Sequence, residues 1–181
     1  MEMTRAMTLK DGRTLTIRQA VAEDAAAILR YIKRVAGESE NIPFTADEFT
    51  TTVEQEVEII EDHALTDNKI FLIGLIDGEI ASVLNFVGGQ RQRVRHAGEF
   101  GLTVRESFWG LGVGTQMMTL LIDWAKSTGI IRRINLIVRA DNRNAIQLYQ
   151  KFGFAEEGVK RRNFLIDGVF YDSLYMGIDL D

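Results

Sequence analysis

Trp109-Gly110-Leu111-Gly112-Val113-Gly114-Thr115 is the strongest local signal in this sequence. It lies between a predicted strand, over about residues 95–104, and a predicted helix that begins at the glycines. Glycines there allow positive φ and let a ligand approach the main chain closely. A helix N-terminus directly behind them offers unpaired N–H groups and the positive end of the helix dipole. The stretch therefore predicts a cradle for a pyrophosphate group.

Other interpretations of this glycine turn were compared with the cradle. A dinucleotide-binding turn requires G-x-G-x-x-G in an opening βαβ unit, and a Walker-type loop requires a Lys after its last glycine. The turn here is G-x-G-x-G, lies past the middle of the chain, and is followed by no Lys. Both motifs are excluded, which leaves the pyrophosphate cradle and a tight turn without any ligand.

Upstream of the turn, the sequence predicts two helices and three further strands besides the one at about residues 95–104. Residues 15–18 alternate as a first strand, and apolar residues repeat at helical spacing after Asp24. A second helix is predicted to begin at Thr45, because Thr45 and Glu48 have capping-box spacing and Phe44 and Phe49 flank them as a hydrophobic staple would. Its apolar stripe would be formed by Phe49, Val53, Val57 and Ile60.

Two hairpins frame the rest of the chain. Residues 70–76, Asp77-Gly78 and residues 80–87 are typical of two strands joined by a tight turn, and the chain closes with a hairpin around Asp167-Gly168. Between them, alternating apolar residues predict a strand with Ile134, Leu136 and Val138, followed by a helix with Ala145, Tyr149 and Phe152. We expect an α/β fold with a mixed, mostly antiparallel central sheet and helices on both faces.

Composition limits the class of protein. The chain has 181 residues, 46% hydrophobic and 26% charged, which suits one globular domain spanning residues 1–181. No Cys is present, and His63 and His96 are too few for an imidazole cage, so no metal site is expected. A net charge of −5 argues against nucleic acid as a partner. Since residues 1–11 hold no apolar run and no stretch is long enough to span a bilayer, we expect a cytoplasmic protein without a membrane partner.

Two segments resemble the GNAT superfamily of N-acetyltransferases. Leu102-Thr103-Val104 followed by residues 109–114 resembles the family's [RQ]-x-x-G-x-[GA] acetyl-CoA loop. Asn142-Arg143-Asn144-Ala145-Ile146-Gln147-Leu148-Tyr149-Gln150-Lys151-Phe152-Gly153-Phe154 resembles the family's N-x-x-A-x-x-x-Y-x-K-x-G-F helix, at the expected distance after the loop. The resemblance extends from Ile17-Arg18-Gln19-Ala20 with Asp24 to the C-terminal hairpin. It implies a single GNAT-like acetyltransferase domain with acetyl-CoA as cosubstrate and no metal.

The resemblance also implies roles for individual residues. Leu102, Thr103 and Val104 would pair with the pantetheine arm, and Asn142 would contact it as well. The glycine turn from Trp109 through Gly110, Leu111, Gly112, Val113 and Gly114 to Thr115 would bind the pyrophosphate. Trp109 stands where the family usually has Arg or Gln, a difference expected to affect contacts at the cofactor's outer end. Tyr149 would protonate the departing thiolate; the alternative is that its ring only packs in the core.

Acetyl transfer to an amine also needs a base. A Lys-like ammonium has a pKa near ~10.4 and cannot attack before it loses a proton. Related enzymes often place a glutamate on the strand before the cofactor segment, and Glu99 has that place here. His96 is the rival, because its ordinary pKa lies close to neutral. An offset of three residues puts the two side chains on opposite faces of a regular strand. Glu99 is the preferred base.

The acceptor is expected to be an amine of a small molecule or a peptide N-terminus. Residues 38–62 hold nine acidic residues and no Lys or Arg, which would attract a cationic amine or simply form a solvated helix face. Residues 161–164 and 167–172 resemble the family branch with spermidine and ribosomal-protein N-terminal acetyltransferases. A non-catalytic acyl-CoA-binding sensor of the same fold is the alternative, although a pure binder needs neither Tyr149 nor Glu99. Small enzymes of this fold frequently dimerise, so a homodimer is also expected.

Overall fold

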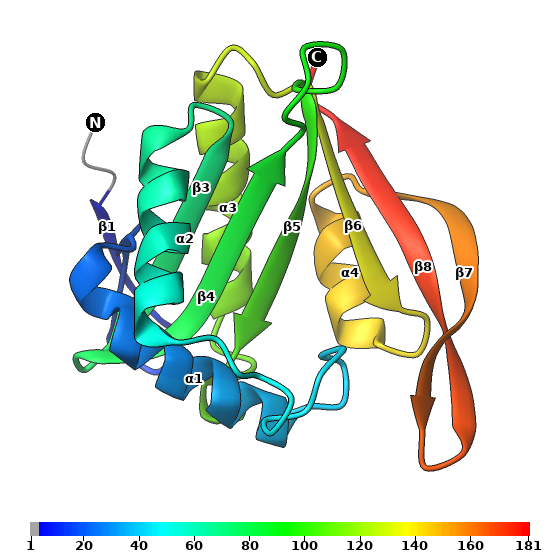
Figure 1. Ribbon diagram of the computed structural model, residues 1–181, viewed down its shortest axis with the longest axis horizontal. Coiled ribbons are helices and arrows are strands. Elements are labelled where there is room, and N and C mark those ends of the chain that lie inside the picture. Colours follow the sequence, from blue (N-terminus) through cyan, green and yellow to red (C-terminus); the bar gives the residue numbers. More distant parts are fainter. Residues whose placement is uncertain (1–3) are drawn as a thin grey trace.

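Eight strands form one mixed sheet in the computed structural model, which describes residues 4–181. The strand order is β1-β2-β3-β4-β5-β6-β8-β7, and all the described neighbours are antiparallel except β5 and β6 (Figure 1). The predicted fold class is confirmed. The strands are β1 (Thr4–Thr8), β2 (Thr14–Gln19), β3 (Lys69–Ile76), β4 (Glu79–Gly88), β5 (Ala97–Val104), β6 (Arg133–Arg139), β7 (Ala155–Ile166) and β8 (Val169–Asp179).

Helices cover both faces of the sheet and enclose two separate apolar cores (Figure 1). Helices α1 (Ala25–Glu38) and α2 (Val53–Leu65) bury one face, while α3 (Val113–Ser127) and α4 (Arg143–Lys151) bury the other. Strand β3 shows the division, since Ile70 and Leu72 belong to the core under α3 whereas Phe71 and Ile73 belong to the core under α1 and α2. Successive side chains of a strand point to opposite faces, so a strand with both faces covered is apolar throughout.

The strand predicted at residues 15–18 is confirmed, but it is not the first one. Residues 15–18 lie in β2, and an earlier strand, β1, pairs with it in antiparallel register from Thr4↔Arg18 to Thr8↔Thr14. Strand β1 is an edge strand whose side chains are almost all exposed. It therefore lacks the apolar alternation by which a half-buried strand is recognised in a sequence.

The predicted start of the second helix was wrong. Thr45 and Glu48 do contact, with the Thr45 N–H donating to a Glu48 carboxylate oxygen at 2.8 Å, but they close a turn. Helix α2 begins at Val53, where Thr52 and Gln55 form a complete capping box. Both pairs have the same spacing. Three β-branched threonines at residues 50–52 follow the first pair and disfavour helix, whereas good helix formers follow the second.

Tight turns were predicted correctly at both hairpins. Asp77 and Gly78 have φ values of 52° and 79°, and Asp167 and Gly168 have values of 48° and 80°. Positive φ at both central residues characterises the turn that matches the right-handed twist of two antiparallel strands.

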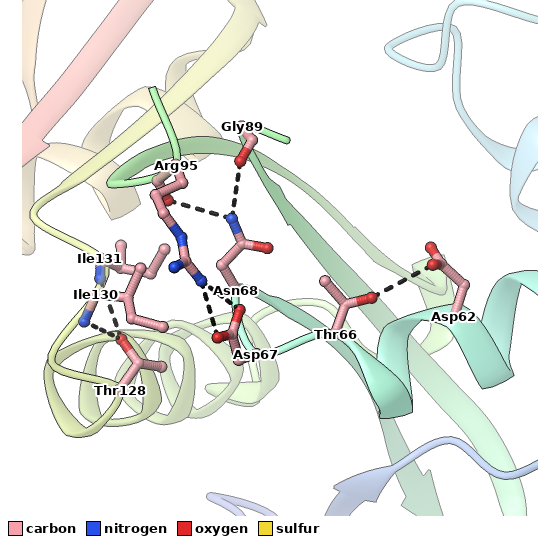
Figure 2. Close-up of polar contacts among 9 residues, drawn as sticks. All are labelled: Asp62, Thr66, Asp67, Asn68, Gly89, Arg95, Thr128, Ile130 and Ile131. Carbon is pink, nitrogen blue, oxygen red and sulfur yellow. Dashed lines mark hydrogen bonds and ion pairs between the residues drawn. The ribbon is translucent and has the colours of Figure 1, made fainter. Parts of the chain in front are cut away.

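Polar contacts hold the loop between β4 and β5 to the start of β3 (Figure 2). The Asn68 carboxamide donates to the carbonyls of Gly89 and Arg95 at 3.0 and 3.2 Å, and the Arg95 guanidinium pairs with Asp67 at 2.8 Å. Asn68 is buried, so these bonds satisfy a polar group that would otherwise be costly. They anchor the loop from which β5 starts its run beside β6.

Candidate active site

Strands β5 and β6 form a fork. They pair only at Ala97, Gly98 and Glu99 of β5, opposite residues 133–135 of β6. Beyond Glu99 the strands separate, and Figure 1 shows α4 beside the opening. Parallel strands in a continuous sheet normally stay within hydrogen-bonding distance. The separation therefore leaves one edge of β5 without a strand partner in the middle of the sheet.

The free edge carries main-chain groups of the predicted cofactor segment. The Arg105 N–H donates to Ala81 of β4 and the Thr103 carbonyl accepts from Ser82 of β4, so these residues face β4. Because main-chain groups alternate in an antiparallel ladder, those of Leu102 and Val104 face the fork. The side chains divide the other way. Leu102 and Val104 pack against the core under α3, whereas the Thr103 hydroxyl contacts Tyr31 of α1 at 3.0 Å.

Trp109 reaches this edge directly. Its indole N–H donates to the Val104 carbonyl at 2.8 Å, while half of the side chain stays exposed. The sequence predicted that Trp109 affects the outer end of the cofactor, but its indole contacts the strand that would hold the pantetheine. No local pattern reveals such a bond, because it depends on how a short 3₁₀ turn at Glu106–Phe108 folds the chain back.

The glycine turn has the open main chain that a phosphate cradle requires. Gly110 and Gly112 have φ values of 75° and 94°, and a Cβ at either would meet no atom within 4 Å. Gly112 is the N-cap of α3, and no side chain caps that helix end. The first N–H groups of a helix have no partner within it, so those at residues 113–115 are available. The side chains of Leu111 and Val113 pack into the core and leave only main chain on the open side.

Gly114 has a different place from the other two glycines. A Cβ there would lie 3.1 Å from a methyl group of Leu148 on α4, and its φ is not positive. Gly114 therefore allows α3 and α4 to approach closely, with Thr115 one residue further into the helix. Its first requirement is packing between the two helices that flank the fork.

Tyr149 lies on α4 at the fork. Its side chain is only 7% exposed, and its ring makes edge contacts with Phe100 at 5.6 Å and a tilted contact with Phe154 at 6.0 Å. Burial raises the pKa of Tyr149 to about 12. The phenol therefore keeps its proton at neutral pH, and its hydroxyl has no hydrogen-bond partner among residues 4–181.

Asn142 begins the same helix. Its side-chain oxygen accepts the N–H of Ala145 at 3.3 Å, which is the N-cap contact of α4. The carboxamide N–H₂ has no partner in the described chain, and Asn142 lines a hollow of about 380 Å³. This hollow is lined by residues 38–41 at the end of α1, by Trp109, and by Arg139 and residues 141–144. The structure thus brings Asn142 and Trp109 to one opening.

Glu99 and His96 lie at different places relative to the fork. Glu99 is exposed and is the last residue of β5 that pairs with β6. His96 precedes β5, and its carbonyl accepts the N–H groups of Arg132 and Arg133. The parity argument does not apply to His96, since it is outside the strand. His96 lies directly before the start of β5, on the far side of Glu99 from the opening.

The acidic residues of 38–62 do not form one field. Glu38 accepts from Arg34 at 3.1 Å and from the Glu106 N–H at 3.0 Å, and Glu56 is buried with 3% exposure. Burial raises the pKa of Glu56. The interpretation of this segment as a solvated helix face holds for part of it only.

Arg139 was missed by the sequence argument. It is buried at the end of β6, pairs with Asp141 at 2.6 Å, donates to the Glu40 carbonyl at 3.0 Å, and stacks on the Tyr171 ring at 4.0 Å. One guanidinium therefore joins the loop after α1, the start of α4 and the late hairpin. The sequence signal that could have indicated it is an arginine directly after the apolar alternation of a predicted strand.

Two further properties concern residues 4–181 alone. No group of three or more His, Cys, Asp or Glu residues within them is placed to hold a metal ion. None of their helices has the length and apolarity required to cross a membrane.

Comparisons with known proteins agree with this geometry. A sequence model of the Acetyltransferase (GNAT) family matches residues 36–154. L-amino acid N-acetyltransferase AaaT of Escherichia coli is 33% identical over 58% of this chain; the match spans 65% of AaaT, less than two thirds of its length. Spermidine N(1)-acetyltransferase of E. coli is 23% identical over 83% of this chain and 80% of its own.

Solved structures show the same architecture. A GNAT-family acetyltransferase from Streptococcus pneumoniae superposes with a TM-score of 0.89 at 34% identity, over 92% of this chain and 99% of its own. A Salmonella typhimurium acetyltransferase solved with acetyl-CoA superposes with a TM-score of 0.80 at 21% identity, over 92% and 94%, which concerns the fold alone. These findings confirm the resemblance drawn from the two motifs. The chain belongs to the acetyltransferase (GNAT) family.

Proposed function

We propose that this protein transfers the acetyl group of acetyl-CoA to the amine of a small molecule at the fork between β5 and β6. The observation that supports the proposal most is the free edge of β5 beside the unpaired N–H groups of the glycine turn. An extended amide chain can add to a strand edge by main-chain hydrogen bonds, and a pyrophosphate suits a helix N-terminus. The strand edge and the glycine turn follow each other along the chain, as the pantetheine arm and the pyrophosphate follow each other in acetyl-CoA.

The residues present fit acetyl-CoA. Residues 110–115 would hold the pyrophosphate through main-chain N–H groups. Leu102 and Val104, whose main-chain groups face the fork, would hold the pantetheine arm, whereas the main chain of Thr103 faces β4. Trp109 and the free carboxamide nitrogen of Asn142 would contact it at the opening. When bound, acetyl-CoA supplies an activated acetyl thioester. Preorganised main-chain donors at the strand edge favour the negative charge that develops on the thioester oxygen.

Tyr149 is the proposed proton donor to the leaving thiolate. Its raised pKa keeps the phenol protonated, and its ring is fixed by Phe100 and Phe154. A general acid must carry its proton at the working pH and hold a defined position. Both conditions are met by a buried tyrosine whose hydroxyl has no other partner in the described chain.

Glu99 is the proposed base, directly or through water. It is exposed on the face of the sheet opposite Phe100, at the point where the strands divide. His96 is the weaker candidate because it lies before the strand, further from the fork. A carboxylate at the fork would also attract the ammonium form of the acceptor.

The acceptor class rests on the relatives. AaaT is named for L-amino acids and the second relative for spermidine, and both are small-molecule amines. A peptide N-terminus is the second acceptor proposed, since a ribosomal-protein-alanine N-acetyltransferase from Brucella melitensis shares the fold at 22% identity.

The proposal is tested by release of free thiol from acetyl-CoA. The purified protein is incubated with spermidine, L-amino acids, phosphinothricin, and a short peptide with a free or a blocked N-terminus. We expect release with at least one small-molecule amine, and a strong loss in Glu99→Gln but a weak one in His96→Gln. Protein that binds coenzyme A without releasing thiol with any amine would instead be an acyl-CoA sensor.

A homodimer and a cytoplasmic location remain proposals. The hairpin of β7 and β8 exposes Leu165, Val169 and Phe170 at its tip, and the outer edge of β7 has no strand partner in the described chain. Exposed apolar side chains beside a free edge favour self-association. Light scattering at micromolar concentration that shows a monomer would exclude the dimer, and cell fractionation would test the location.

A further inference from the structure

Gly101 leaves an open notch in the middle of the sheet. It lies on β5 opposite Asn85 of β4, two residues beyond the last residue that pairs with β6, and it is exposed. A Cβ at Gly101 would meet only one atom within 4 Å outside its chain neighbours, the side-chain oxygen of Asn85 at 3.1 Å. The φ of Gly101 is not positive, so the backbone does not require glycine there. What the glycine provides is space.

Asn85 borders this notch with an unused carboxamide. It lies on β4 opposite Gly101, and opposite Phe71 of β3 on its other side. Phe71 is buried under α2, whereas Asn85 is half-buried at the limit of that apolar cover. Its side chain has no hydrogen-bond partner within residues 4–181. A half-buried polar group without a partner is unfavourable unless a ligand or water satisfies it.

The notch lies between Glu99, the proposed base, and the main-chain groups of Leu102, which face the fork. Glu99 lies two residues before Gly101 and therefore shares its face of β5. Leu102 follows Gly101 and presents its main-chain groups to the fork. A nitrogen atom above Gly101 would thus lie between a carboxylate, a carboxamide oxygen and the strand edge.

We propose that Gly101 and Asn85 form the binding site, or seat, of the acceptor amine. The Asn85 side-chain oxygen would accept a hydrogen bond from one N–H of the amine. This inference rests on the proposed function. The seat suits a primary amine, because the attacking nitrogen needs a free lone pair and one proton to lose. Its remaining N–H then serves Asn85. A secondary amine has no N–H left for Asn85 once its reacting proton is committed, so primary amines are the preferred class.

The test separates the amine from the cofactor in steady-state kinetics. The amine acetylated best by the wild type among spermidine, L-amino acids and phosphinothricin is compared with its N-methyl derivative. In Asn85→Ala, kcat/KM for the primary amine should fall by about 10-fold to 100-fold, the usual effect of a lost hydrogen bond to a charged donor, because the amine nitrogen becomes positively charged as its bond to the acetyl carbon forms. The Kd of coenzyme A and the melting temperature should not change. Asn85→Asp, which keeps an accepting oxygen, should lose less than Asn85→Ala.

Gly101→Ala supplies an independent variant. Its Cβ fills the notch against Asn85, so it should raise KM for the amine and leave coenzyme A binding intact. Gly158→Ala is the matched control, because a Cβ there makes an ordinary contact with Tyr175 at 3.8 Å. Unchanged amine kinetics in both Asn85→Ala and Gly101→Ala would overturn the inference, as would equal losses for amine and coenzyme A. Wild-type protein that binds coenzyme A but acetylates no amine would refute the proposed function, and the inference with it.

Discussion

The indole N–H of Trp109 donates a 2.8 Å hydrogen bond to the main-chain carbonyl of Val104. This contact ties the glycine turn to the free edge of β5, the two parts of the chain that acetyl-CoA is proposed to bridge. An amide of the pantetheine arm that approaches Val104 meets a carbonyl already engaged by the protein. Unless Trp109 moves, the main-chain groups of Leu102 and the N–H of Val104 are the ones left for the pantetheine arm.

Trp109 should report coenzyme A binding by its fluorescence. Trp109 is 51% exposed at the opening, whereas Trp124 is 8% exposed in the core under the sheet. We expect a saturable change in emission on titration with coenzyme A in Trp124→Phe and none in Trp109→Phe. Calorimetry supplies the Kd of each variant independently. An emission change that persists in Trp109→Phe would place the cofactor elsewhere.

Gly112 and Gly114 should respond differently to substitution. Gly112→Ala places a side chain at a φ of 94°, which costs about 1–2 kcal/mol of strain and alters the cradle. We expect at least about a tenfold loss of coenzyme A affinity, equivalent to ~1.4 kcal/mol, with a folded protein. Gly114→Val instead crowds Leu148 and should lower the melting temperature as well. Circular dichroism and calorimetry on both variants separate the two effects. A melting temperature of Gly114→Val equal to that of the wild type would contradict the packing role of Gly114.

Tyr149→Phe should slow the chemical step. The substitution deletes the O–H and keeps the ring contacts with Phe100 and Phe154. If Tyr149 is the general acid, kcat should fall by about 10²–10⁴-fold, while coenzyme A affinity and melting temperature change little. Turnover within about twofold of the wild type, measured where chemistry limits the rate, would leave Tyr149 a packing residue.

Glu56→Gln should stabilise the protein at neutral and alkaline pH. Burial raises the pKa of Glu56 above its value in the unfolded chain. The protonated carboxyl is thus favoured in the folded state, and its contribution to stability is lost as the pH rises through the raised pKa. The melting temperature of Glu56→Gln should exceed that of the wild type at pH 8, and the difference should shrink towards pH 4.

The expected rise in the melting temperature of Glu56→Gln depends on the length of the chain. Each 1 kcal/mol of relief should raise the melting temperature by about 2–4 °C in a protein of this size. Glu58→Gln, on the exposed side of the same helix, is the control and should show little change at either pH. A difference that grows as the pH falls would contradict the assignment.

Local patterns determined most elements of this protein. Positive φ at Asp77-Gly78 and Asp167-Gly168, and the glycine turn before α3, depend on residues adjacent in the chain. The apolar repeats of α1, α3 and β6 likewise involve neighbours a few residues apart. The N-cap of α2 at Thr52, in contrast, is one of two capping boxes with the same spacing, and the spacing alone does not distinguish them. Edge strand β1 had no apolar alternation to reveal it.

Tertiary structure alone decided the site. The fork depends on β5 and β6 parting after Glu99, although 28 residues lie between the two strands in the chain. The bond between Trp109 and Val104, the stacking of Arg139 on Tyr171, and the notch between Gly101 and Asn85 each join groups that no helical or strand period relates. Sequence periodicity indicates which face of a helix or strand is buried. It does not record which distant group the opposite face meets, because that is set by packing of the whole sheet.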